Sequence, residues 1–137
     1  MTAWLGIASA EHVRRGVELG IAQIGHGRRA GLVRMLLGDL LVHYPPRETL
    51  GGSPLQGFTA IGRIADEEVW QEDEGEFRPL RRRVDYDMSV QPVALEVVRE
   101  DLDLTSGPHW GHRLRRGPVE LTTSDAGTLS AAMRGAR

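Results

Sequence analysis

The five histidines of this chain are the side chains best suited to hold a metal ion, because imidazole is the commonest metal ligand in proteins. They stand at positions 12, 26, 43, 109 and 112, so that His109 and His112 are three residues apart. The sequence has no HExxH motif, no cysteine and no acidic residue at a characteristic ligand spacing. It also contains neither GxGxxG nor a P-loop. We therefore expect no metal ion and no cofactor, and histidines that form structural hydrogen bonds.

Ser9 and His12 have the spacing of a nucleophile and its base, since acyl transfer requires a base in contact with a hydroxyl group. Glu11 or Asp39 could orient the histidine. Ser9 also stands between an apolar run and a helical pattern, which is where N-cap serines occur, and no GxSxG sequence surrounds it. We interpret Ser9 as an N-cap and predict that the protein is not an enzyme. The backbone amides at that helix start could still bind an anion or a base edge.

The tryptophans are candidates for stacking on a nucleobase, an interaction that contributes roughly 1–3 kcal/mol per base. Trp110 stands among small residues in the stretch 107–111, which favours a place at the rim of a pocket. Trp4 suits a core position equally well. The aromatic residues therefore permit a pocket that binds a base without strong electrostatics.

The charge pattern argues against a uniformly basic surface. All 17 basic residues are arginines, and the formal net charge is −2. Contacts with nucleic acid would therefore come from local clusters. Arg81, Arg82 and Arg83 form such a cluster, which more often marks a solvated strand end but could contact a phosphate backbone.

The first part of the chain predicts the elements that would position Ser9 and His12. Residues 4–8 form a short apolar run typical of a buried strand, and Ser9 begins a helix over 10–19 that Gly20 limits. A short extended piece over 21–24, a turn over 25–27 and helical spacing over 32–37 follow. The apolar run 40–44 indicates a core strand.

The second part predicts further strands and a final helix. Residues 58–64 alternate as a strand, with 67–71 as its partner, and 82–88 alternate again. Residues 92–99 are helical or extended, 110–115 suggest a strand, and Thr123 or Ser124 caps a last helix. Short strands mixed with helices, without regular βαβ units, favour an α+β barrel or sandwich.

Length and hydrophobicity place limits on the whole chain. A chain of 137 residues buries about two thirds of its unfolded surface around one core, so we expect a single domain over 1–137. The longest apolar runs are much shorter than the roughly 20 residues that cross a bilayer, and no signal-peptide pattern is present. We expect a cytoplasmic protein with no membrane partner.

Beyond these local patterns, the order and spacing of several segments resemble the EVE family of small bacterial proteins, a PUA-like family related to YTH domains. The segments that carry the resemblance are Trp4, 8–13 and Gly16; 20–23 with 26–28; Leu32 with 34–35 and 38–39; 58–62; 82–84; and 109–111. The chain departs from the family at three places: Arg28 replaces a lysine, Gly31 a proline, and Tyr44-Pro45-Pro46 a Tyr-Ser-Pro.

The resemblance implies an α+β fold, a PUA-like mixed β-barrel of about five to six strands flanked by helices. It also implies a pocket between the first strand–helix junction, the His-Gly loop and neighbouring strand ends. Related domains take a modified base of DNA or RNA out of the stack into such a cavity. The implied function is a nucleic-acid-associated binding module that recognises a modified nucleobase.

From this resemblance we predict which residues bind. The predicted ligand-binding residues are Ser9, His12, Gln23, His26, Gly27, Arg28, Tyr44, Trp70 and Trp110. Gln23 would read a base edge through its amide, and Tyr44 and Trp110 would stack on the ring. Trp70 and Phe77 would form an outer aromatic wall. The predicted contacts with the nucleic-acid backbone are Arg81, Arg82 and Arg83.

Two alternatives remain open at this point. The first is a small hydrolase or nuclease of the ASCH-like type, which would use Ser9, His12 or His26. The second is a protein-interaction module whose pocket is vestigial and filled by side chains.

Overall fold

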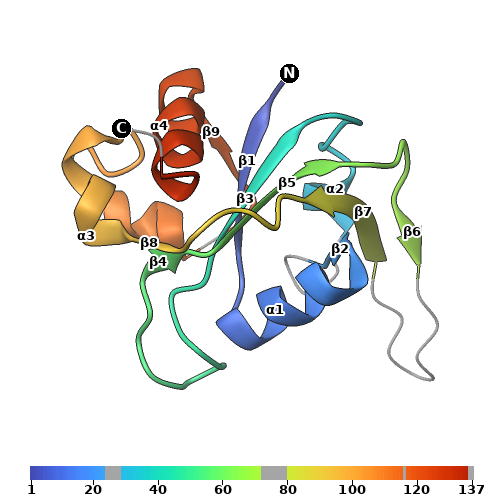
Figure 1. Cartoon of the computed structure of the whole chain (residues 1–137), viewed down its shortest axis with the longest axis horizontal. Coiled ribbons are helices and arrows are strands. Elements are labelled where there is room, and N and C mark those ends of the chain that lie inside the picture. Colours follow the sequence, from blue (N-terminus) through green and yellow to red (C-terminus); the bar gives the residue numbers. More distant parts are fainter. Residues whose placement is uncertain (24–28, 72–79, 116, 136–137) are drawn as a thin grey trace.

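The computed structural model describes residues 1–23, 29–71, 80–115 and 117–135 (Figure 1). The elements of the first half are β1 (Ala3–Ile7), α1 (Ala10–Leu19), β2 (Ile21–Ala22), α2 (Arg29–Leu32), β3 (Leu40–Tyr44), β4 (Gly57–Phe58) and β5 (Ala60–Ile64). The elements of the second half are β6 (Trp70–Gln71), β7 (Leu80–Tyr86), β8 (Val93–Ala94), α3 (Leu95–Val98), η2 (Arg99–Asp101), η3 (Trp110–Leu114), β9 (Val119–Leu121) and α4 (Thr123–Met133).

A seven-stranded mixed sheet is the centre of the molecule. Its hydrogen-bonded order is β2-β7-β5-β3-β1-β9, with β6 added beside β7, while β4 and β8 form a separate pair. β1 and β3 run parallel, and the other pairs are antiparallel. Within the described residues no hydrogen-bonded pairing joins β2 to β9, so the sheet stays open. The expected α+β fold, with a mixed sheet flanked by helices, is confirmed, but among the described residues the sheet does not close into the expected barrel.

The central strands have a hydrophobic core on each face, because successive side chains of a strand point to opposite faces. Leu40, Val42 and Tyr44 of β3 belong to the core that contains residues of α3 and α4. Leu41 of the same strand packs with Trp4 in the other core. Figure 1 shows α3 and α4 on one side of β1 and β3, and α2 with β2 on the other. The two faces of the sheet therefore have different neighbours.

Helix α1 begins and ends as the sequence predicts. Ser9 lies in extended conformation at the N-cap, and its Oγ accepts a hydrogen bond from the backbone nitrogen of His12 at 3.4 Å. Gly20 ends the helix in the left-handed conformation at φ 68°. Gly16 permits close packing, since a Cβ there would lie 2.8 Å from the carbonyl oxygen of Ile21. The turn of β2 toward the sheet depends on this close approach.

Several predicted elements are wrong. A helix was expected over 32–37, but α2 ends at Leu32. The backbone amide of Leu36 donates to the Asp39 carboxylate at 2.9 Å instead of to a helical carbonyl. Where a strand was expected over 110–115, residues 110–114 form a 3-10 helix. The strand expected at 67–71 is shortened to β6 and pairs with β7 instead of β5. The cap of the last helix is Thr122, not Thr123 or Ser124.

Arg82 belongs to the core, which corrects its predicted place on a nucleic-acid surface. Its side chain is 1% exposed. The guanidinium donates to Asp66 Oδ1 at 2.6 Å, to the Asp66 carbonyl at 2.8 Å, to the Leu32 carbonyl at 2.9 Å and to the Met35 carbonyl. These acceptors fix the segment after α2 against β7. Each guanidinium nitrogen has a protein acceptor and the side chain is buried, so Arg82 has a structural role and does not face a phosphate.

We expect Arg82→Ala to lower the free energy of unfolding by about 3–5 kcal/mol, because it leaves a carboxylate and buried carbonyls without their partner. Urea unfolding of the two proteins measures this change. The control is Arg83→Ala at the next position, where the side chain is exposed and the expected cost is below about 1 kcal/mol. Equal losses in the two variants would contradict the role assigned to Arg82.

Candidate functional site

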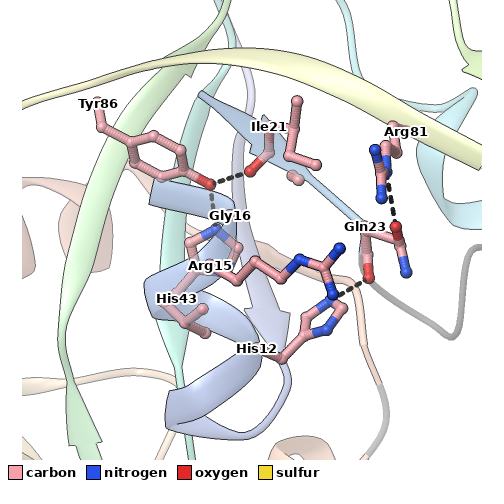
Figure 2. Close-up of a pocket in the computed structure, with 10 residues that line it drawn as sticks. His12, Arg15, Gly16, Ile21, Gln23, His43, Arg81 and Tyr86 are labelled. Carbon is pink, nitrogen blue, oxygen red and sulfur yellow. Dashed lines mark hydrogen bonds between the residues drawn. The ribbon is translucent and has the colours of Figure 1, made fainter. Parts of the chain in front are cut away.

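A small cavity lies between α1, β2 and the adjoining ends of β3 and β7. We call it the α1 cavity, and its volume is about 50 Å³. Its polar lining is drawn in Figure 2 and consists of His12, Arg15, Gln23, His43, Arg81 and Tyr86. Gly16 and Ile21 complete one wall, so the close contact between α1 and β2 also shapes the cavity.

His12 connects α1 to the residue that follows β2. Its Nε2 lies 2.7 Å from the backbone oxygen of Gln23. A carbonyl oxygen only accepts, so His12 must carry a hydrogen on Nε2. This bond holds Gln23 at the mouth of the α1 cavity.

Gln23 presents its amide nitrogen as an unused donor. Its Oε1 accepts a hydrogen bond from Arg81 Nε at 2.7 Å. Arginine only donates, and this fixes which end of the amide faces Arg81. Within the described residues the amide nitrogen of Gln23 has no hydrogen-bond partner. The α1 cavity therefore has a free donor on one wall.

His43 lines the same cavity and has an unused acceptor. The Tyr86 hydroxyl donates its single hydrogen to the Ile21 carbonyl at 2.8 Å, so it must accept from His43 Nε2, which lies 2.8 Å away (Figure 2). The neutral ring then carries its hydrogen on Nε2 and leaves Nδ1 as an acceptor. This Nδ1 is buried and has no partner among the described residues.

Burial holds the His43 ring in its neutral form. It lowers the pKa of His43 to about 4, and the nearby His12 lowers it further in the same direction. Burial also raises the pKa of the Tyr86 hydroxyl, so that group keeps its hydrogen at neutral pH. The donor and acceptor roles in this pair are therefore fixed across the physiological pH range.

A second and larger cavity lies on the other face of the sheet. We call it the Trp110 cavity, and its volume is about 510 Å³. It lies between the ends of β1 and β3, the segment 46–56, α3 with η2, and η3. Tyr44 and Trp110 both line it.

The structure therefore divides the predicted site residues between two places. His12, Gln23 and Arg81 line the α1 cavity, whereas Tyr44 and Trp110 line the Trp110 cavity. The expected convergence of all of them on a single cavity does not occur, because His43 and Tyr44 are neighbours on β3 and face opposite sides. Ser9 caps α1 and lines neither cavity.

Trp70 is placed beside the α1 cavity and not in its lining. Its ring lies under Arg81 and Arg83, with the guanidinium carbons 5.8 Å and 5.0 Å from the ring centroid. Of the predicted backbone contacts, Arg83 is exposed, whereas Arg81 is 6% exposed. His26, Gly27, Arg28 and Phe77 lie outside the described residues.

Sequence reasoning missed His43 and Tyr86. A histidine inside the otherwise apolar run 40–44 was the available signal, since a polar side chain in a core strand requires a partner. The partner is separated from it by 43 positions, and local patterns do not join residues over that distance.

Residues 1–23, 29–71, 80–115 and 117–135 contain no group of three or more histidine, cysteine or acidic side chains placed to hold a metal ion. In the same ranges no helix has the length and hydrophobicity needed to span a bilayer.

Comparison with known sequences gives matches over nearly the whole chain. The sequence model of the EVE domain matches residues 2–131. A UPF0310 protein of Renibacterium salmoninarum is 47% identical over 131 residues, which are 95% of this chain and 94% of that protein. A UPF0310 protein of Streptococcus mutans is 40% identical over 121 residues, 87% of each chain.

Comparison with solved structures extends the likeness to the fold. The crystal structure of protein Atu2648 from Agrobacterium tumefaciens has a TM-score of 0.61 at 17% identity, and covers 99% of this chain and 94% of that one. The YTH domain-containing protein mmi1, solved as a complex with RNA, has a TM-score of 0.58 at 6% identity, over 96% of this chain and 80% of that one. The expected YTH-related, PUA-like fold is thereby confirmed.

We expect the free energy of unfolding to fall as pH is lowered from 6.5 to 4. The pKa of His43 is about 4 in the folded protein and near 6.5 in an unfolded chain, so the unfolded state binds more protons in this window. The loss is on the order of 1–3 kcal/mol. Urea unfolding at several pH values measures it.

The control for this prediction compares two histidines. His43→Phe should flatten the profile between pH 4 and 6.5, whereas His112→Phe, at an exposed position, should keep the slope of the unaltered protein. Asp39 and Asp87 have lowered pKa values, so most of what their carboxylates contribute to stability is lost below the ordinary pKa of 3.8, under the lower end of the window. Parallel profiles for all three proteins would contradict the buried state of His43.

Proposed function

The chain belongs to the EVE domain family, and from that membership we propose that it binds nucleic acid and recognises a modified nucleobase without catalysing a reaction. Its likeness in fold to a YTH domain-containing protein solved with RNA supports the nucleic-acid partner. The observation that carries the proposal is a pair of unused hydrogen-bonding groups, the buried His43 Nδ1 acceptor and the Gln23 amide donor, on two residues that line one cavity.

A buried polar group without a hydrogen-bond partner lowers the stability of the free protein, and a ligand that supplies the partner removes this loss. A buried acceptor without a partner destabilises a protein by roughly 1–3 kcal/mol. His43 Nδ1 has that cost in the free protein, and a donor on a bound base would remove it. The edges of nucleobases combine donors and acceptors side by side, so they complement a cavity that offers one of each.

The size of the α1 cavity defines how a base would enter. A volume of about 50 Å³ accommodates one edge of a ring with its substituent and is smaller than the roughly 300–1,000 Å³ of sites that enclose a whole ligand. Arg15 is exposed and extends across the cavity toward His12 and Gln23 (Figure 2). We infer that Arg15 swings away when the base enters and then covers it.

Two side chains beside the cavity fit contacts outside the base itself. The exposed Arg83 could meet a phosphate of the strand, and Trp70, which lies under it, offers an aromatic surface next to the cavity mouth. Arg82 has no part in this contact, because its guanidinium is committed to acceptors in the core.

The arrangement of Ser9 and His12 supports binding over hydrolysis. The hydroxyl of Ser9 accepts from the backbone nitrogen of His12, whereas the His12 ring faces the Gln23 carbonyl at 2.7 Å. A base must contact the hydroxyl that it activates, and among the described residues no hydrogen bond joins a ring nitrogen of His12 to Ser9 Oγ.

The test uses short oligonucleotides that carry either an unmodified base or one modified base, with 5-methylcytosine and N6-methyladenine in the first panel. We expect calorimetry to show tighter binding of a modified strand than of its unmodified counterpart. Gln23→Ala should reduce that preference about tenfold, because it removes the donor on the cavity wall.

The matched control is Gln91→Ala, which alters an exposed glutamine far from the α1 cavity and should keep the preference. A panel without any preference for modified strands, or a preference that Gln23→Ala leaves intact, would refute the proposal.

A further inference from the structure

The Trp110 cavity has the size and lining of a binding site in its own right. Its volume of about 510 Å³ falls in the range of small-molecule sites, roughly 300–1,000 Å³. It lies on the face of the sheet opposite the α1 cavity, and no residue lines both. A ligand in one cavity therefore does not occupy the other.

Three arginines give the Trp110 cavity a positive charge. Arg47, Arg99 and Arg115 line it, with Glu96 as the acidic residue of the lining. Within the described part of the chain, neither Arg99 nor Arg115 forms an ion pair. Guanidinium groups that have no carboxylate partner are suited to bind a phosphate, because their planar donors match its oxygens.

Aromatic side chains add a surface for a flat ring. Trp110 is half-buried, and the Arg99 guanidinium lies 5.1 Å from its ring centroid. Tyr44 is 2% exposed and lines the cavity, yet its hydroxyl has no hydrogen-bond partner among the described residues. A hydroxyl at a cavity wall that has no protein partner is a group to which a ligand can bond.

The backbone around this cavity is strained. Among the described residues, two that are not glycine have a positive φ, Gln56 at 52° and His109 at 60°. Gln56 lines the cavity, and His109 directly precedes Trp110. Such conformations cost roughly 1–3 kcal/mol each and are concentrated at functional sites. Gln56 ends the segment 46–56 and His109 precedes η3, so both conformations occur in chain segments beside the Trp110 cavity.

We propose that the Trp110 cavity is a second binding site, distinct from the α1 cavity, for a nucleotide. The base would stack against Trp110, and the phosphate would be bound by Arg99 and Arg115. The same chemistry is found in a free mononucleotide and in one unit of a nucleic-acid strand. The inference goes beyond the proposed recognition of a modified base, because it requires no modification and uses other residues.

The experiment follows the three indole N–H signals of ¹⁵N-labelled protein during titration with AMP. Trp110→Phe identifies the signal of Trp110. We expect AMP to shift that signal while the signal of Trp4, which is 3% exposed, stays in place. Adenosine, which lacks the phosphate, and inorganic phosphate, which lacks the ring, should each bind at least tenfold more weakly than AMP.

Variants separate the proposed contacts from general charge. Arg99→Gln and Arg115→Gln should each weaken AMP binding about tenfold, and Tyr44→Phe should weaken it severalfold. Arg113→Gln is the matched control, since Arg113 is an exposed arginine of the same 3-10 helix that does not line the cavity. Gln23→Ala, on the other face, should also leave AMP binding unchanged.

Three results would overturn the inference: no shift of the Trp110 signal, AMP binding no tighter than that of phosphate alone, or equal weakening by Arg113→Gln and Arg115→Gln.

Competition with an unmodified single-stranded oligonucleotide distinguishes the sources of the ligand. Displacement of AMP supports the site as one for a unit of a strand, and retention of AMP supports it as one for a free nucleotide.

Discussion

The alternation of side chains along β3 is the constraint on which the arrangement of this molecule depends. Because β3 lies inside the sheet between β1 and β5, each of its side chains must point to one face or the other. Leu41 and His43 are directed to the face of α1 and β2, and Leu40, Val42 and Tyr44 to the face of α3 and α4. Two cores and two cavities follow from this single pattern, so one strand supplies a polar group to each cavity.

The buried polar groups of the chain divide into those that are satisfied and those that are not. Asp39 accepts from Leu36, Trp4 and Thr2, and although burial raises the pKa of its carboxyl, these hydrogen bonds hold that pKa below its usual range. Arg82 is likewise saturated with acceptors. His43 Nδ1 and Trp70 Nε1 are buried without a hydrogen-bond partner among the described residues. The hydrogen bonds of Asp39 and Arg82 stabilise the fold. Buried groups without a partner destabilise it, so stability does not account for their presence.

Local signals in the sequence were sufficient where one segment determines its own structure. The apolar run at Trp4, the cap at Ser9 and Gly20 at the helix end predicted β1 and α1, and the family resemblance predicted the fold. Contacts between distant segments were not predictable. Residues 110–115 have the composition of a strand, but His109 enters the left-handed region and starts a 3-10 helix there. Arg82 is charged, and acceptors from distant segments, the Asp66 carboxylate and the carbonyls of Leu32 and Met35, make its burial possible.

The two cavities differ in the chemistry that they can recognise. The α1 cavity offers a neutral acceptor whose hydrogen position is fixed by the chain from His43 through Tyr86 to Ile21, so it selects by the pattern of donors on an edge. In the Trp110 cavity, Arg99 and Arg115 have no ion pair within the described part of the chain, and Arg99 lies over the Trp110 ring, so the proposed site would select by negative charge and flatness. A neutral, directional site distinguishes similar bases, whereas a charged, stacking site binds all of them. Specificity and general affinity would then be assigned to opposite faces of one sheet, and each could change in evolution without loss of the other.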